Sequence, residues 1–349
     1  MSSIVRPSRS RLLQLITAML PYAALILIFV GMGVRDLIRE SHVNSDGVHD
    51  TPAIFCTQQN LSSLARECAP IIVAAAGMTL VILTGGIDLS AGSIMGVSSA
   101  VACLAANRFQ NPALGMLCGV GAGLLCGVLN GTLVIGLRVQ SFIVTLGMLM
   151  SLRGITRLLN KNSSVYIGDG IIDKATSSAL LANFKWLSGN IPGVGVPWFL
   201  LVAIAAVVVL GIVLNYTRLG RRLYAVGSNE EAARLSGVRV GPTKLVAYAI
   251  AGMTAGMAGV MNATRLGGST PQTGESKELT IIAAVVIGGT SLLGGQGTIA
   301  GCVLGTVLMQ ALSSACTSLR LDDSYQMVII GLFLVGAAAI DLLRHEKAS

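Results

Sequence analysis

Paired glycines interrupt an otherwise apolar chain at two points, and the first pair is followed by an acidic residue. In residues 84–93 (TGGIDLSAGS), Gly85 and Gly86 precede Asp88 and Ser90. Paired glycines break a helix, and Asp and Ser are residues that cap the helix that follows. A helix that begins at a break inside a membrane can also bind a polar ligand there. Two interpretations stay open: Asp88 is a structural cap, or it contacts a substrate.

The second interruption, residues 288–297 (GGTSLLGGQG), ends an apolar run that begins at Glu278. A charged residue inside a membrane marks a transport path, whereas a charge near a helix end often reaches the interface. Arg153 and Arg157, one helical turn apart, allow the same two interpretations. The residues that we predict for a path through the membrane are Gly85, Gly86, Asp88, Ser90, Glu278, Gly288 and Gly289.

The residue types needed for catalysis or for binding ATP are not grouped in this sequence. There is no GxxxxGK[ST] phosphate loop, and the seven cysteines include no CxxC pair. We therefore predict no catalytic residue, no metal and no cofactor bound by this chain. The cysteines are expected to be buried thiols. Cys56 and Cys68 share a polar stretch, so a disulfide between them is the alternative.

A stripe of glycines at four-residue spacing predicts close helix packing. Residues four apart lie on one helix face, and small residues let two membrane helices approach closely. A dinucleotide-binding loop would need a preceding strand and a different spacing. The stripe consists of Gly115, Gly119, Gly123 and Gly127, and the same spacing recurs at 252 and 256 and at 297, 301 and 305.

A short helix is predicted in the charged segment 216–242. Asn229 is a suitable N-cap, Glu230 and Glu231 complement the positive end of the helix dipole, and Gly237 ends the helix. Ala232 and Ala233 favour helix between them. The small face of this helix could enter a cleft of a partner protein. The alternative is a solvated connector.

The composition places these segments in a membrane. Of 349 residues, 53% are hydrophobic and only 11% are charged, against roughly a quarter in an average soluble domain. The net charge of +8 fits the basic cytoplasmic loops of a membrane protein, so we predict no nucleic-acid partner. The predicted fold is all-α, a polytopic membrane protein with about ten transmembrane helices, glycine-rich packing and broken helices. The predicted spans are residues 12–34, 68–84, 90–106, 113–137, 141–159, 197–214, 243–264, 278–293, 298–317 and 324–343.

The distribution of basic residues predicts which side each loop faces. With the N-terminus inside, Lys and Arg are about twice as dense in the inner segments as in the outer ones. The whole chain, 1–349, is then one transmembrane domain with both termini, 1–11 and 344–349, in the cytoplasm. Segment 216–242 is cytoplasmic, and loops 35–67 and 160–196 are periplasmic.

Four sequence blocks in order resemble the ribose-type monosaccharide permeases of ABC importers. The blocks are 81–92 (VILTGGIDLSAG), 139–154 (VQSFIVTLGMLMSLRG), the segment 220–237, and 282–297 (IAAVVIGGTSLLGGQG). The resemblance extends over about residues 70–160 and 215–343. Lys277 and Thr280 stand where ribose-type members often have tyrosine and aspartate, so ribose itself does not follow from the resemblance.

The resemblance implies a transport subunit and not an enzyme. It implies an ATPase partner that binds ATP and Mg, a periplasmic sugar-binding protein, and a second permease copy or a related chain, in the bacterial inner membrane. Residues Asn229 to Ala233 and Gly237 would form the coupling helix that touches the ATPase, and the chain would translocate a monosaccharide by alternating access. The alternative functions are a secondary transporter or channel that uses Asp88 or Glu278 as an ion relay, or a scaffolding membrane protein.

Overall fold

The computed structural model describes residues 23–35, 55, 57–193, 195–322 and nine positions between 324 and 336. Its described elements are helices, apart from two strands of two residues each. After a helix at Ala23–Arg35 they are α2 (Gln58–Leu83), α3 (Ala91–Phe109), α4 (Pro112–Leu137), α5 (Ser141–Leu159), β1 (Val165–Tyr166), α6 (Lys174–Lys185), η1 (Trp186–Ser188), α7 (Trp198–Tyr216), α8 (Arg218–Ser228), α9 (Glu230–Leu235), α10 (Val240–Leu266), β2 (Gly268–Ser269), α11 (Lys277–Ile287) and α12 (Ile299–Ser318).

Six of these helices are long and apolar enough to cross a membrane: α2, α4, α5, α7, α10 and α12. Each overlaps a predicted span. The predicted span 278–293 is helical only in its first part, because Gly288 ends α11 after 11 residues, about 16 Å of helix. Span 90–106 corresponds to α3, which has the length but not the apolar composition. Spans 12–34 and 324–343 fall partly outside the described residues, as does loop 35–67; segments 1–11 and 344–349 fall wholly outside them.

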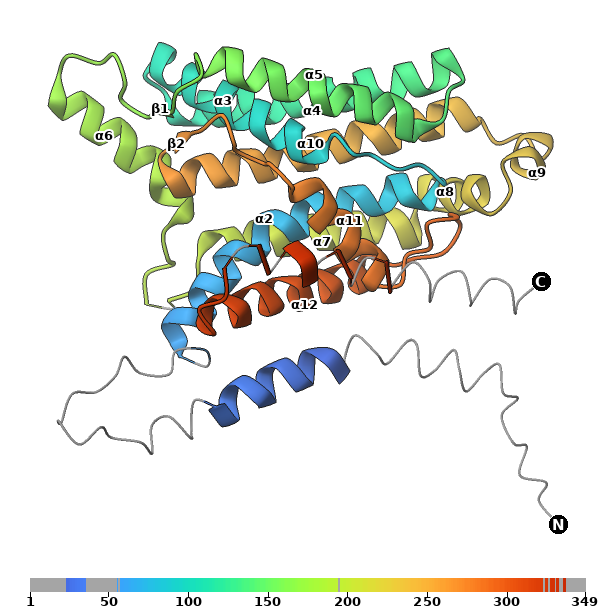
Figure 1. Ribbon diagram of the computed structural model, residues 1–349. Coiled ribbons are helices and arrows are strands. Elements are labelled where there is room, and N and C mark those ends of the chain that lie inside the picture. Colours follow the sequence, from blue (N-terminus) through green and yellow to red (C-terminus); the bar gives the residue numbers. More distant parts are fainter. Residues whose placement is uncertain are drawn as a thin grey trace.

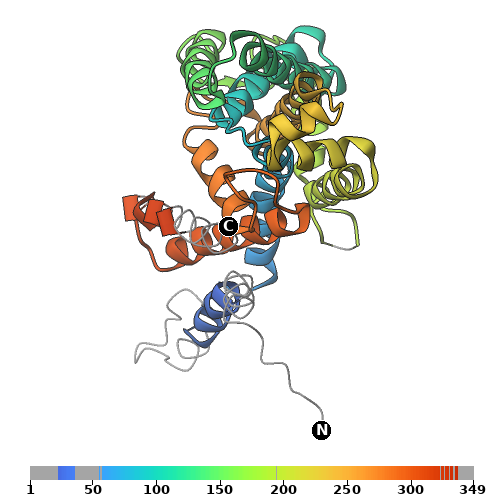
Figure 2. The same cartoon turned by 90° about the vertical axis from the view of Figure 1, so that its right-hand side faces the viewer.

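Helix α2 is the centre of the bundle. It is apolar on all sides, and every residue from Cys68 to Leu83 is buried. A helix that is hydrophobic all round must be surrounded by other helices. Helices α10, α7, α12 and α11 pack around it, and Figure 2 shows α2 between the group containing α3, α4 and α5 and the group containing α11 and α12.

The outer helices present apolar side chains to the surroundings. Leu117 and Leu125 on α4, Leu158 on α5 and Val209 on α7 are each more than half exposed. Large apolar surfaces of this kind are unfavourable in water and are expected where a helix faces lipid or a partner helix. The chain is therefore built as a multi-pass membrane protein.

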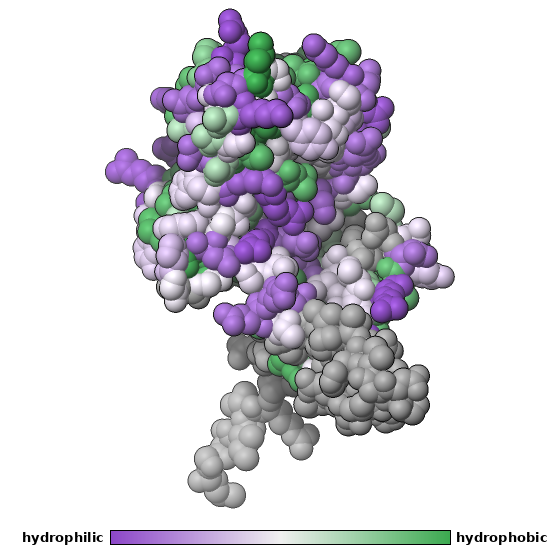
Figure 3. Space-filling model, turned by 90° about the vertical axis from the view of Figure 1, so that its left-hand side faces the viewer, coloured by the Kyte–Doolittle hydropathy of each residue, from purple (hydrophilic) through white to green (hydrophobic). Residues whose placement is uncertain are grey.

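The two ends of the bundle carry the polar segments. Figure 1 shows α8 and α9 at one end and α6 with the strand pair at the other. The strands are antiparallel, with Val165 opposite Ser269. The surface of the α6 end is largely hydrophilic (Figure 3). Neither the strand pair nor α6 was predicted, although Asp173 marks the start of α6 by accepting hydrogen bonds from the N–H groups of Ala175 and Thr176.

Cys68 is a free, buried thiol of α2 in this structure. Cys56 lies outside the described residues. The structure therefore contains no disulfide at Cys68 and agrees with the prediction of a buried thiol.

Candidate translocation path and coupling segment

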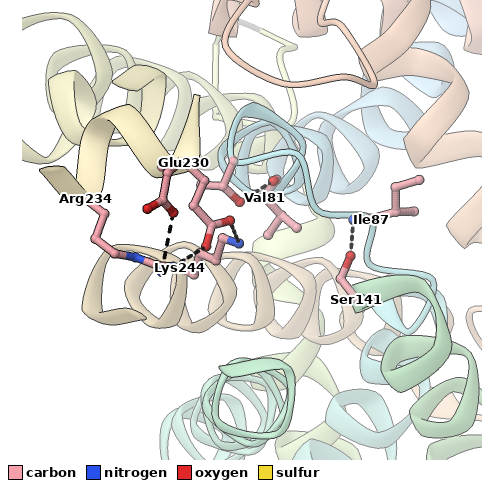
Figure 4. Close-up of polar contacts among 8 residues, drawn as sticks. Val81, Ile87, Ser141, Glu230, Arg234 and Lys244 are labelled. Atoms are coloured by element: carbon pink, nitrogen blue, oxygen red, sulfur yellow. Dashed lines mark hydrogen bonds and ion pairs between the residues drawn. The ribbon is translucent and has the colours of Figure 1, made fainter. Parts of the chain in front are cut away.

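The first helix break lies between α2 and α3. Gly85 has φ +73°, a conformation that glycine adopts without strain. The backbone groups freed by the break find partners: Gly86 N–H donates to the Val81 carbonyl at 3.2 Å, and Ile87 N–H donates to Ser141 Oγ at 3.1 Å (Figure 4). Irregular backbone at membrane depth is tolerated only when its polar groups are satisfied in this way.

Asp88 is an internal anchor of this break. It is 1% exposed, and its Oδ1 accepts from Ser90 N at 2.8 Å and from Ser90 Oγ at 2.6 Å. Asn130 of α4 donates to Ser90 Oγ at 2.7 Å and lies 3.4 Å from both carboxylate oxygens of Asp88. These contacts tie the start of α3 to α4. They favour the structural interpretation of Asp88. No sequence pattern predicted the part played by Asn130, which is 42 residues away.

The second break packs directly against the first. Gly288 ends α11, and Gly289 follows with φ +89°. Further along this loop, Gly295 N–H donates to the Leu83 carbonyl, the last residue of α2, at 3.0 Å. The two interruptions, which lie about 200 residues apart in the sequence, thus form one joint at the α8–α9 end of the bundle.

Helix α8 contacts this joint and was not predicted. Tyr224 Oη donates to the Gly297 carbonyl at 2.7 Å. Gly227 packs so closely that a Cβ there would run into the Leu83 carbonyl and would lie 2.5 Å from Gly295 N. Gly227 therefore allows three backbone segments to meet. In the sequence, the feature that could have indicated this contact is Gly227 near the end of the amphipathic segment that forms α8.

The predicted helix after Asn229 is present as α9. Asn229 Oδ1 accepts from Ala232 N at 2.9 Å, and Gly237 follows the helix with φ +82°. Ala233 is buried against the bundle, whereas Ala232 and Glu231 are exposed. The side chain of Leu235, which the sequence analysis did not single out, is 82% exposed. Helix α9 thus presents a small, partly apolar face away from the bundle.

Glu230 fixes α9 to the start of α10. Its carboxylate accepts from Lys244 Nζ at 2.6 Å and from Arg234 Nη2 at 3.2 Å (Figure 4). The hydrogen bond from Lys244 lowers the pKa of Glu230 below its ordinary value, and the charge of Arg234 adds to this effect. Glu230 is therefore ionised at neutral pH and holds α9 against α10.

Glu278, at the start of α11, forms an ion pair with Arg153 of α5. Arg153 Nη2 lies 2.8 Å from Glu278 Oε1, and the Glu278 side chain is only 8% exposed. The second oxygen, Oε2, is buried without a hydrogen-bond partner. Gly92 makes room for this carboxylate, since a Cβ there would collide with it. Arg153 is therefore more than a charge at the membrane interface, because it forms an ion pair with Glu278, 125 positions away.

The glycine stripe of α4 lies against α10 and α3. A Cβ at Gly123 would lie 2.5 Å from the Cα of Gly256, and one at Gly119 would lie 2.7 Å from the Ser98 carbonyl. The main chains of α4 and α10 are therefore in direct contact. Gly115, Gly119, Gly123 and Gly127 are all buried.

A cavity of about 1050 Å³ opens between the first break, the α4–α5 connection, and α9 with the loop that follows it. Its wall includes Gly85 and Gly86 on one side and Glu230 on the other. The joint of the two breaks and α9 are therefore neighbours at the same end of the molecule.

Comparisons with known proteins identify the family of this chain. Residues 60–338 match the family model described as "Branched-chain amino acid transport system / permease component". The chain belongs to this permease family. Its members are transport subunits, which agrees with the prediction of a subunit that is not an enzyme.

Several relatives of this permease are sugar import proteins. It is 37% identical to the ribose import permease protein of Escherichia coli K12 over 290 residues, which cover 82% of this chain and 87% of that protein. It is 35% identical to the fructose import permease protein of Rhizobium meliloti, with 82% and 79% covered. It is 33% identical to the xylose transport system permease protein of Escherichia coli K12, with 85% and 88% covered. No solved structure matches the chain.

Proposed function

We propose that this permease is the membrane subunit of an ATP-driven monosaccharide importer and that α9 is its coupling helix. The observation that carries the proposal is the contact of α8 with both helix breaks, at Tyr224–Gly297 and around Gly227. Because α9 follows α8 after a single residue, a force applied to α9 reaches the joint of the two breaks. A separate ATPase would supply that force, binding ATP and Mg, while this chain binds no cofactor.

The sugar class comes from the relatives. Ribose, fructose and xylose, which their names give, are monosaccharides. We infer a monosaccharide substrate for this chain as well, delivered by a periplasmic sugar-binding protein. A second permease copy or a related chain would complete the pore.

The proposed topology has ten membrane crossings in the bacterial inner membrane, with both termini in the cytoplasm. It adds the crossings expected at 12–34 and 324–343, α3 and the α11 segment to the six long helices. Basic residues concentrate at the α8–α9 end, where Arg218, Arg221 and Arg222 lie, and this end is then cytoplasmic.

The sugar path is proposed to pass the Arg153–Glu278 pair. Arg153 is 24% exposed and lies six residues before the end of α5, about 9 Å inside the helix. A guanidinium group facing lipid at that depth is costly, so this face of α5 is expected to line a polar path. The free Glu278 Oε2 is an acceptor suited to a sugar hydroxyl.

Coupling is tested by Gly237→Val and Glu231→Lys. Valine at φ +82° strains the end of α9, and lysine reverses a charge on its exposed face. We expect sugar uptake to fall at least about tenfold in both, because losing a hot-spot contact of an interface costs about 2 kcal/mol or more and tenfold corresponds to about 1.4 kcal/mol. Membrane insertion should be unchanged. Uptake is measured in whole cells that also produce the ATPase and the binding protein.

The matched control is Gly193→Val at the opposite end of the molecule. Gly193 has φ +80°, and no atom lies near its Cβ position, so the backbone strain is the same. Normal uptake in this control and loss in Gly237→Val would assign the effect to α9. Normal uptake in Gly237→Val and Glu231→Lys would remove the coupling assignment.

A further inference from the structure

The cavity beside α9 has a charge that transport of a neutral sugar does not explain. We propose that it binds a phosphate-bearing ligand, which is either a soluble phosphorylated sugar or phosphate, or the headgroup of an anionic lipid. The proposal rests on the proposed function only in placing this cavity on the cytoplasmic face.

The cavity wall is strongly cationic. Arg138, Arg234, Arg239 and Lys244 line it, and the acidic residue among the described lining residues is Glu230. Glu230 is already shared by Lys244 and Arg234. Arg138 and Arg239 form no ion pair within the part of the chain that the structure describes. Two guanidinium groups are thus left to pair with an anion, which they bind by bidentate hydrogen bonds.

Two helix N-termini meet in the same cavity. The first turn of α5, at Ser141 and Phe142, and the first turn of α10, at Val240 and Gly241, both line it. Neither helix has a side-chain hydrogen bond at its N-cap. The first N–H groups of a helix have no partner within the helix, and its dipole favours negative charge there. Both helices therefore add to the attraction for an anion.

A buried hydroxyl group supplies the independent observation. Tyr248 lines the cavity and is only 1% exposed. Its Oη makes no hydrogen bond of normal geometry, although it is near enough to Ser141 to interact with it. A buried hydroxyl without a well-formed hydrogen bond is unfavourable, and a phosphate oxygen or a ligand hydroxyl would satisfy it.

The size of the cavity suits a small ligand. About 1050 Å³ lies at the upper end of the roughly 300–1,000 Å³ of small-molecule sites. An anion there would compete with Glu230 for Lys244, the residue that holds α9 to α10. Occupancy would therefore change how firmly α9 is held, and the ligand would regulate transport from the cytoplasmic side.

The test is direct binding to the full chain in phosphatidylcholine nanodiscs without the ATPase. The probes are radiolabelled inorganic phosphate and ribose 5-phosphate, with neutral ribose as the comparison. We expect saturable binding of a phosphate probe, weakened at least about tenfold in Arg138→Gln/Arg239→Gln, because that variant loses both unpaired guanidinium groups of the cavity. Arg239→Lys, which keeps the charge, should weaken binding less.

The control variant is Arg221→Gln/Arg222→Gln, which removes two exposed arginines of α8 outside the cavity. Phosphatidylglycerol in the nanodiscs tests the lipid source: thermal stabilisation that is lost in the cavity variant but kept in the control would assign the site to a headgroup.

The proposal fails if neither phosphate nor phosphatidylglycerol acts, or if the control variant loses as much as the cavity variant. A separate pull-down with the ATPase gives the other contrary result: a cavity variant that binds phosphate normally but no longer associates with the ATPase would make the cavity a protein docking site. Because binding is measured without the ATPase, its failure is independent of the coupling test.

Discussion

Gly123→Leu should prevent the chain from folding into a stable bundle, whereas Gly121→Leu should leave it intact. At Gly123 an added Cβ would lie 2.5 Å from the Cα of Gly256 and 2.6 Å from the Gly252 carbonyl. Both atoms belong to the main chain of α10, so they cannot move aside as a flexible side chain would. At Gly121, on the same helix, no atom lies within 4 Å of the Cβ position.

The expected cost of Gly123→Leu exceeds about 3 kcal/mol, the upper end of the usual range for overpacking. Thermal unfolding and size-exclusion profiles of the detergent-purified chain measure it. We expect the Gly121→Leu variant to elute and unfold like the unchanged protein. Equal behaviour of the two variants would show that α4 and α10 are not packed backbone to backbone.

Arg153→Gln should destabilise the protein and abolish uptake, whereas Arg157→Gln should have little effect on stability. The first change leaves the buried carboxylate of Glu278 without its cation. Removing one partner of a buried ion pair costs about 3–5 kcal/mol. Arg157 is exposed one turn further along α5 and has no ion pair within the described residues.

The double variant Arg153→Gln/Glu278→Gln separates a structural role from a role in the path. Two amides can form a neutral hydrogen bond, so most of the stability should return. If the pair contacts sugar, uptake should stay low with a raised KM. Recovery of both stability and uptake in the double variant would show that the pair only holds α5 to α11.

Features that depend on neighbouring residues in the sequence could be predicted. Asn229 caps α9 and Gly237 follows it because capping needs only residues a few positions apart. The glycine stripe of α4 could be predicted for the same reason, since one helix face is set by its own spacing.

Contacts between distant segments could not be predicted. Arg153 and Glu278 are 125 positions apart, and nothing in either segment specifies the other. The span at 278–293 was overestimated because its apolar run continues past Gly288, where the backbone leaves the helix to meet α2. Helix α6 was missed because its polar sequence resembles a loop, although Asp173 and Thr176 mark its start.

Uptake by purified components tests the central claim most directly, namely that ATP hydrolysis in a partner drives sugar through this chain by way of α9. Proteoliposomes would contain this permease in the membrane and the ATPase inside. The binding protein and labelled monosaccharide would be outside, and the ATPase or ATP would be left out of the comparison samples. We expect uptake only when the ATPase and ATP are both present, and its loss in Gly237→Val. Uptake driven by an ion gradient without the ATPase would contradict the account and favour a secondary transporter.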